Sequence, residues 1–474
     1  MGGEDGPGPY PPGHPVEEGV AGLPRPGLQV PLPGKPGPLQ EDGEAQPPPQ
    51  LLHEGRVQVG VGPEAVVQMG DDRLPPQGVD QVGHGHRVPP AGDGQDQGVL
   101  GGEAVQGLPE GLQDVHAPHH NEEVDLTFRF DRYPYLTAHL PGVGGRIRTF
   151  PRDFQVEEVP AYLPSGQGEH LYVLLEKEGL TTRQVFEFLR DELGIPEKEI
   201  GVAGLKDKHA LTRQWFSLPR AYEDRLCLLE NLRGVRLLAA DLHTNKLRTG
   251  HLKGNRFRVL IREPEGGKER AEAVLALLRE KGVPNYFGPQ RFGLGGRNPE
   301  RGYRLVKTGK GRGTPWLKRF LIGSLQSLLF NDWVALRMER GLFDRVVLGD
   351  VAKKHDTGGE FLVQDPERES ERALRLEISA TGPLFGKKYF QSQLEARALE
   401  DEVLARYGLA REEFGARRGA RRPIRVPLAE VGLEEKEEGL WLSFFLPKGS
   451  YATSLLREVM KKDPEEPLEE DEAE

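Results

Sequence analysis

The chain has almost no cysteine, since Cys227 is the single one in 474 residues. One thiol forms neither a disulfide framework nor a cysteine-rich zinc site, and its scarcity fits a reducing cytoplasm. No run of about 18 or more apolar residues occurs, so the sequence predicts no membrane span. The N-terminus lacks a basic stretch followed by an apolar core, so we expect no secretory signal. These absences predict a cytoplasmic protein.

The common metal and nucleotide motifs are missing as well. HExxH, CxxC, GxSxG and the EF-hand loop do not occur. GPLFGKK at 382–388 has one residue too few between its glycines for a phosphate loop. GLGG at 293–296 is not followed by a predicted helix, so it is a weak dinucleotide signal. No standard cofactor site remains.

Basic residues are scarce at the two ends of the chain. Residues 1–120 hold 17 acidic and 5 basic residues, and the last twelve hold 8 acidic and no basic ones. Residues 121–462 therefore hold 58 basic and 49 acidic residues, although the whole chain has a net charge of −11. An excess of basic residues in 121–462 favours an anionic partner such as nucleic acid. A charge-rich thermostable surface would give the same balance.

The first 123 residues are predicted to be disordered. Gly and Pro make up 46 of the first 120 residues, which leaves too little apolar surface to offset the chain entropy. The seven histidines there do not predict a metal site, because a flexible segment offers no preformed one. We also predict that the start codon is assigned too early and that translation begins at Val124. Peptides from residues 10–110 in the native protein would contradict this.

Beyond this segment, strand and helix patterns alternate irregularly. Strands are predicted at 170–178, 234–244, 255–263 and 440–446, and helices at 181–194, 266–282, 319–341, 393–408 and 451–462. Residues 128–162 indicate short strands and turns, and 297–318 a basic loop. Connections between strands are often too short for parallel crossovers, which favours an α+β fold with a mixed, mainly antiparallel sheet.

The composition changes after residue 293, which suggests two domains. We place a first domain at 124–289, an inserted domain at 290–425 and a return to the first domain at 426–462. An acidic tail follows at 463–474.

Residues 201–219 carry the strongest candidate site. In GVAGLKDKHALTRQWFSLP, small residues allow a tight turn, Asp207 lies between Lys206 and Lys208, and the end predicts a buried strand. The neighbouring ammonium groups favour an ionised carboxylate, which suits a nucleophile or a base. An aspartate that caps a turn would give the same pattern, so this segment alone leaves both interpretations open.

Two further segments place cations beside aromatic or apolar residues. The first is a predicted hairpin with Lys246, Arg248, Lys253, Arg256 and Arg258, and the second is NYFGPQRFG at 285–293, which contains Arg291. Cations bind phosphates and aromatics stack on bases, as single-stranded or distorted RNA requires. A solvated hairpin with structural aromatics is the alternative.

Five segments together match one known family. Residues 201–219 resemble the motif GLKDRxAxTxQ, and LRTGHLKGNRF, NYFGPQRFG, ATGPLFG and SFFLPKGSYATSLLRE follow it in order. This set resembles the TruD family of tRNA pseudouridine synthases, over residues 126 to about 462. The resemblance implies a pseudouridine synthase-like catalytic domain with an inserted α/β TRUD-type domain. Residues 1–120 lie outside it.

The resemblance implies that a uridine of tRNA, expected at position 13 in the D-stem, is isomerised to pseudouridine without cofactor or metal. Asp207 matches the essential aspartate, which attacks the sugar C1′ or the base, or abstracts a sugar proton. Asn255 and Phe257 match the residues that orient the aspartate and stack on the target base. Arg148 matches the basic residue that pairs with the essential aspartate, which is often a lysine in the family.

The expected RNA contacts follow from these matches and from the basic loops. They are Lys206, Lys208, Lys246, Arg248, Lys253, Arg256 and Arg291. We expect a monomer with tRNA as its partner, no obligate protein partner and no membrane association. A tRNA-binding or chaperone-like protein and a uracil-releasing glycosylase are the alternatives. The activity of Asp207→Asn tests the first, and product analysis tests the second.

Overall fold

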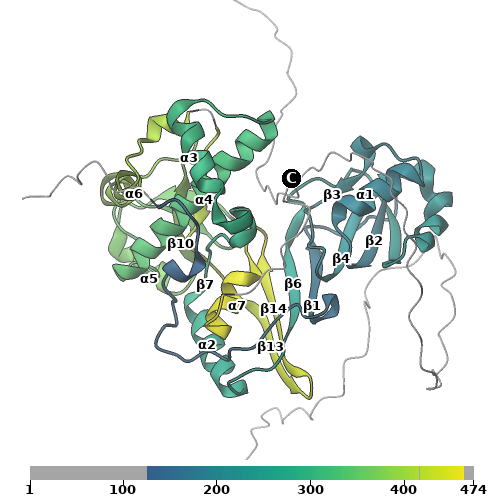
Figure 1. Ribbon diagram of the computed structural model, residues 1–474, viewed down its shortest axis with the longest axis horizontal. Helices are drawn as coiled ribbons and strands as arrows, with labels where there is room; N and C mark the ends of the chain where they lie inside the picture. Colours follow the sequence, from purple (N-terminus) through teal and green to yellow (C-terminus); the bar gives the residue numbers. More distant parts are fainter. Residues whose placement is uncertain (1–124, 416, 464–474) are drawn as a thin grey trace, which may run out of the picture. The chain divides into compact units, whose positions relative to one another are not determined.

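The computed structural model describes residues 125–415 and 417–463 (Figure 1). The fold below is that of the compact unit from Thr127 onward. The predicted disorder of residues 1–123, the predicted start at Val124 and the acidic tail after Asp463 lie outside the described residues. None of the helices in the described ranges combines the length and apolar composition needed to cross a membrane.

A mixed sheet contains the strands of residues 154–261 and 429–447. Its strands are β1 (Phe154–Pro160), β2 (His170–Glu178), β3 (Gly201–Val202), β4 (Leu211–Pro219), β5 (Val235–His243), β6 (Leu252–Ile261), β13 (Ala429–Lys436) and β14 (Gly439–Pro447). They are ordered β13-β14-β6-β1-β4-β2-β5, with β3 paired to β4. β1 and β4 run parallel, and the other pairs are antiparallel. The predicted α+β fold with a mixed, mainly antiparallel sheet is confirmed.

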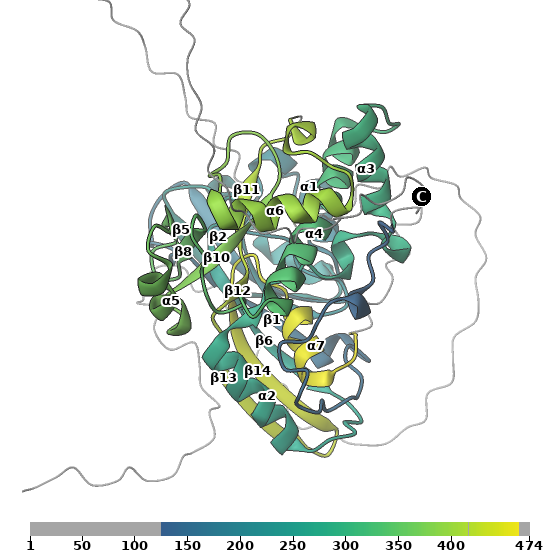
Figure 2. The same cartoon turned by 90° about the vertical axis from the view of Figure 1, so that its left-hand side faces the viewer.

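Helices pack on this sheet. α1 (Thr182–Asp191) begins where the Thr181 side chain caps it, and it buries Val185 and Leu189 against β2 and β4. α2 (Lys268–Lys281) and α7 (Ala452–Met460) pack together against β1, β6 and β14 (Figures 1 and 2). The amphipathic patterns of these segments therefore predicted the right elements.

A second sheet lies between the two parts of the first in sequence. Its strands β8 (Val351–Lys354), β9 (Glu360–Leu362), β10 (Ile378–Leu384) and β11 (Ala420–Pro423) are ordered β11-β10-β8-β9. The helices of this region are α3 (Asn298–Thr308), α4 (Pro315–Glu339), α5 (Pro366–Leu374) and α6 (Leu394–Arg406). β12 (Arg425–Val426) pairs with β7 (Val283–Pro284) just before the chain re-enters the first sheet. The domain boundaries at 290 and 425 stay a prediction.

Single-turn and irregular 3₁₀ segments connect these elements. They are Phe130–Arg132, Pro151–Asp153, Glu197–Glu199, Arg220–Asn231, Pro289–Arg291, Leu294–Gly296 and Arg411–Phe414. Residues 128–153 were expected to contain short strands, but β1 begins only at Phe154. Aromatic residues of this segment pack against one another instead, as Phe130 and Tyr133 do with Tyr286.

The predicted loop at 297–318 is wrong, because it contains α3. The glycines within residues 297–318 made the sequence pattern less typical of a helix. Gly302 has a packing reason, since a Cβ atom there would lie 2.2 Å from the carbonyl oxygen of Leu321 in α4. Glycine is unfavourable inside a helix, yet here it allows α3 to approach α4 closely.

Candidate active site

The loop between β3 and β4 presents Asp207. One carboxylate oxygen, Oδ2, accepts a hydrogen bond from Nη2 of Arg148 at 3.0 Å. The other, Oδ1, accepts one from Nε2 of Gln290 at 3.4 Å. The Asp207 side chain is 35% exposed, whereas that of Arg148 is 5% exposed. A buried guanidinium thus holds a carboxylate that solvent, and hence a substrate, can still reach.

Arg148 adopts an unusual backbone conformation. Its φ of +58° lies in the left-handed region, which costs a non-glycine residue roughly 1–2 kcal/mol. The guanidinium carbon lies 4.2 Å from the centre of the Phe154 ring, within the range of a cation–π contact. Such strain persists only where the surroundings hold it, and it is concentrated at functional sites.

Lys177 fixes the backbone of the Asp207 loop. It is fully buried on β2, and its Nζ donates to the carbonyl oxygens of Leu180, Lys206 and Asp207 at 2.5, 3.3 and 3.1 Å. No motif in the sequence marks this residue. The period of two in β2 was an available signal, because Lys177 falls on the same face as the buried Leu175.

A second set of buried hydrogen bonds holds the same loop. The hydroxyl of Thr182, at the start of α1, accepts from the backbone N–H of Lys206 at 3.0 Å and donates to Gln214 at 3.1 Å. The side-chain amide of Gln214, on β4, donates to the carbonyl oxygen of Gly204. Satisfied buried networks of this kind favour one conformation, so the loop is held from α1, β2 and β4.

Lys206 has a structural role here, so its phosphate contact stays a prediction that the structure disfavours. Its Nζ lies 2.8 Å from Oε2 of Glu158 on β1, and the two side chains are 6% and 0% exposed. A buried ion pair of this geometry leaves no ammonium group for a phosphate. Lys208, on the other side of Asp207, is half-buried and has no carboxylate partner within the described residues.

Asn255 and Phe257 lie on one face of β6. Phe257 is 9% exposed, stacks on Phe444 at 5.1 Å and meets Phe154 edge-on at 6.2 Å. Phe154 therefore contacts both Phe257 and Arg148. The Oδ1 atom of Asn255 is buried without a hydrogen-bond partner in the described part of the chain. Asn255 does not hold the Asp207 carboxylate in this structure, whereas Gln290 does.

Gln290 is a further functional candidate within NYFGPQRFG, and it was not among the residues predicted from the sequence. The aromatics expected to stack on bases, Tyr286, Phe287 and Phe292, are buried in the protein core. Gln290 is exposed and faces Asp207. Arg291, expected as an RNA contact, is only 8% exposed, and its role stays a prediction.

Alternation along β6 separates the predicted RNA contacts. Arg256 lies on the face opposite Asn255 and Phe257, and it pairs with Glu430 at 2.6 Å and Glu157 at 3.4 Å. The RNA contact of Arg256 stays a prediction, and its place on the opposite face of β6 argues against a contact beside the site. Lys246 donates to the carbonyl oxygen of Lys198, and partial burial lowers its pKa.

Arg248 and Lys253 are exposed and form no ion pair with a carboxylate in the described ranges. Lys448, which was not among the predicted residues, lies next to them. Its backbone N–H donates to the carbonyl oxygen of Lys253, and its Nζ donates to that of Gly250 at 2.9 Å. Burial lowers the pKa of His251, and the positive charges of Arg248 and Lys448 lower it further. We refer to Arg248, Lys253 and Lys448 as the hairpin cations.

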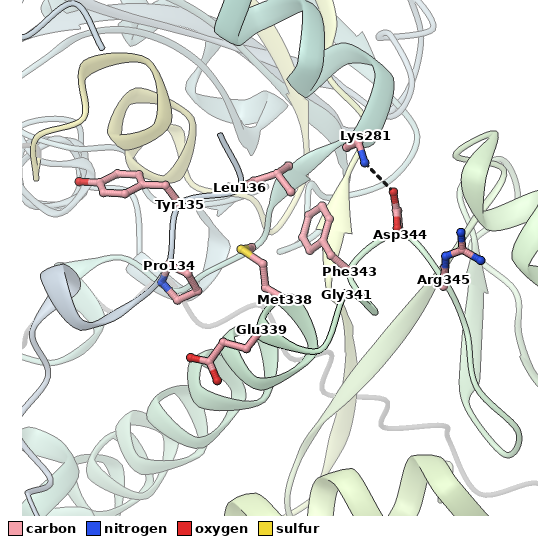
Figure 3. Close-up of a pocket in the computed structure, with 10 residues that line it drawn as sticks. All are labelled: Pro134, Tyr135, Leu136, Lys281, Met338, Glu339, Gly341, Phe343, Asp344 and Arg345. Carbon is pink, nitrogen blue, oxygen red and sulfur yellow. Dashed lines mark hydrogen bonds and ion pairs between the residues drawn. The ribbon is translucent and has the colours of Figure 1, made fainter. Parts of the chain in front are cut away.

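A cavity of about 520 Å³ lies elsewhere (Figure 3). Tyr135, Met338 and Phe343 contribute to its walls, and Lys281 and Asp344 form an ion pair of 2.9 Å at its edge. None of the ten residues that line it is among those around Asp207. This cavity therefore does not mark the candidate site, whereas the strained, buried partner of a partly exposed carboxylate does.

The family model of tRNA pseudouridine synthase D (TruD) matches residues 132–307 and 314–459, more than half of the chain. The chain belongs to the TruD family. The predicted family membership is thereby confirmed.

TruD relatives cover most of the described chain. The tRNA pseudouridine synthase D of one strain of Thermus thermophilus is 80% identical over 346 residues, which are 73% of this chain and 97% of that protein. The one of Anaeromyxobacter sp. strain Fw109-5 is 46% identical over 344 residues, 70% of this chain and 97% of its own length. A crystal structure of a Methanosarcina mazei TruD shares the fold, with a TM-score of 0.57 at 24% identity over 70% of this chain and 96% of that chain.

Proposed function

We propose that this chain isomerises a uridine of tRNA to pseudouridine and that Asp207 performs the chemistry. One observation carries the assignment to Asp207: a carboxylate held at 3.0 Å by the buried guanidinium of Arg148 remains open to solvent. The membership in the TruD family supports the reaction and the substrate class. Position 13 of the D-stem is the expected target.

The reaction requires no other group than an ionised acid in contact with the nucleotide. The bond from C1′ to N1 breaks, the uracil turns, and a bond from C1′ to C5 forms. The C5 proton leaves to solvent, and N1 gains a proton. In these steps Asp207 acts as a nucleophile that attacks either C1′ or the uracil ring. Alternatively, it acts as the general base that removes a proton from the sugar. Arg148 orients the carboxylate for each of these routes.

The target base must leave its stack, which costs a few kcal/mol in folded RNA. Phe257, which is 9% exposed, lies on the face of β6 that also carries Asn255. Contact with an aromatic ring recovers about 1–3 kcal/mol per base. The unpaired Oδ1 of Asn255 supplies an acceptor for the N3–H of uracil, which would satisfy a buried group that is otherwise left alone.

The hairpin cations and Lys208 supply the phosphate contacts in this proposal. They carry no carboxylate partner in the described ranges, unlike Arg256 and Lys206. Exposed cations release counterions on binding RNA, so affinity should fall steeply with salt. We further propose that the protein acts as a monomer in the cytoplasm, where tRNA is modified.

The test is to map pseudouridine in tRNA from cells with and without this gene, and in transcripts treated with the purified protein. Loss of pseudouridine at position 13 in the deletion strain, and its appearance in the transcript, are expected. A transcript with cytidine at that position is the control. Unchanged tRNA in both experiments would contradict the proposal. Release of free uracil would show a glycosylase instead.

A further inference from the structure

Three arginines lie close to one another near the turn that carries Gln290, and they take no part in the isomerisation. Arg291 lies in the turn Pro289–Arg291, Arg319 on α4, and Arg417 just before β11. We propose that these three residues, the arginine cluster, bind one backbone phosphate of the RNA next to the target uridine. This inference rests on the proposed function.

Arg291 is buried without an acidic partner. Its Nε donates to Oγ of Ser327 at 3.2 Å, and its guanidinium lies 5.8 Å from the ring centres of Phe287 and Phe320. No carboxylate of the described residues forms an ion pair with it, and burial lowers its pKa. A buried cation is costly unless an anion compensates it.

Arg291 and Arg417 converge on one point of α4. A Cβ atom on Gly323 would lie 2.9 Å from Nη2 of Arg291 and 2.8 Å from Nη1 of Arg417. The absence of a side chain at Gly323 therefore leaves room for both guanidinium groups. Nη1 of Arg417 also donates to the carbonyl oxygen of Arg319.

The three positive charges repel one another. Burial lowers the pKa of Arg417 to about 10, with further contributions from Arg291 and Arg319. The side chain of Arg319 is exposed and forms no ion pair within the part of the chain described. An anion between these groups would offset the repulsion. Phosphate suits the planar, multidentate guanidinium better than a single-point anion does.

A nearby arginine is excluded from this cluster by its hydrogen bonds. Arg422 donates to the backbone and side-chain oxygens of Asn285 at 3.1 and 2.6 Å, and to the carbonyl oxygen of Gly449 at 2.8 Å. Its guanidinium also lies 4.0 Å from the Phe287 ring centre. Arg422 thus makes three hydrogen bonds to neutral acceptors, whereas Arg291 makes one side-chain hydrogen bond within the described residues, to Ser327.

The cluster is tied to the reacting carboxylate through one short turn. Gln290 contacts Asp207, and the next residue is Arg291. A phosphate held by the arginine cluster is therefore attached to a nucleotide near the flipped uridine. Its binding would place the sugar of that uridine against Asp207, which gives the cluster a positioning role.

The test measures the affinity of an unmodified tRNA transcript as a function of salt. Arg319→Gln and Arg417→Gln are made in an Asp207→Asn background, which prevents turnover during binding. Each should bind about tenfold more weakly. Each should also reduce the slope of log affinity against log salt by about 0.7–0.9, the value for one phosphate contact. Arg291→Gln is added if its melting temperature equals that of the parent.

The matched control is Arg375→Gln, which removes an exposed arginine that pairs with Glu377 at 2.7 Å. It should leave affinity and slope unchanged. Parent-like affinity and slope in both cluster variants would overturn the inference. A fully active Asp207→Asn enzyme would instead overturn the proposed function, so the two failures are distinguishable.

A chemical substitution in the RNA then identifies the phosphate. Single methylphosphonates, which are neutral, replace the phosphates around the target uridine one at a time. At one position, the methylphosphonate should weaken binding to the parent protein. It should not weaken binding to Arg319→Gln or Arg417→Gln, because these variants already lack an arginine that contacts that phosphate. Equal losses in parent and variants at every position would refute a direct contact.

Discussion

Arg148→Met should slow isomerisation far more than it weakens tRNA binding. The guanidinium donates to Asp207 at 3.0 Å and is 5% exposed, so it orients the carboxylate without reaching the RNA surface. A hydrogen bond to a charged group is worth about 1.5–3 kcal/mol. If that amount is lost from the transition state alone, the rate falls about 10- to 150-fold.

The assay is single-turnover release of tritium from C5 of uridine, combined with a binding measurement on the same transcript. Arg148→Lys should lie between wild type and Arg148→Met, because lysine keeps the charge but not the planar contact with Phe154. Arg148→Gly is the control for folding, since glycine adopts a φ of +58° without strain. It should lose rate while its melting temperature stays near that of wild type.

A wild-type rate in Arg148→Met would refute this reasoning. An equal loss of rate and affinity would also refute it, because Arg148 would then contribute to binding in general rather than to the reacting carboxylate.

Three further predictions concern charges around the two sheets. Lys206→Met should lower the free energy of unfolding by about 3–5 kcal/mol, because Glu158 then stays buried without a cation. In denaturant titrations, the double variant with Glu158→Met should recover most of this loss, and a single variant as stable as wild type would contradict the buried pair. Lys253→Ala should reduce the salt slope of tRNA binding by about 0.7–0.9, whereas Arg256→Ala on the opposite face should not, and equal slopes would refute this assignment of faces. Burial, with neighbouring cations, lowers the pKa of His355 from 6.5 to about 4, so between these pH values the unfolded chain binds a proton that the folded chain does not. The free energy of unfolding should therefore fall as the pH drops from about 6.5 to about 4. His355→Gln should flatten that part of the stability profile, and an unchanged profile would contradict this.

The elements that the sequence predicted well are those with a strong local pattern. The strand at 170–178 and the helix capped by Thr181 occur as expected, because alternation and capping are encoded by adjacent residues. α3 was missed because Gly302 serves a contact with α4 that no local pattern reveals. Residues 128–153 resembled strands because their aromatics are needed in the core, where they pack without strand pairing.

The sequence predicted the site residues that lie within a single motif, but not the partners that lie far away in the chain. Asp207 is marked by its own motif, but the partners that define its surroundings are distant in sequence. Gln290 lies 83 residues away from it, and Glu158 lies 48 residues from Lys206. Whether a lysine binds phosphate or a buried glutamate depends on such long-range contacts. The sequence alone therefore placed Lys206 and Arg256 on the RNA, and the structure gives both of them protein partners.

The central claim is that the carboxylate of Asp207 performs the isomerisation. Asp207→Asn keeps the size of the side chain and removes its charge, so the loop held by Lys177 should stay in place. In single-turnover tritium release from a tRNA transcript, we predict a rate at least about 100-fold below wild type, the lower range for loss of a catalytic acid–base group, with affinity for the transcript retained. Conversion of uridine at the wild-type rate by Asp207→Asn would contradict the account.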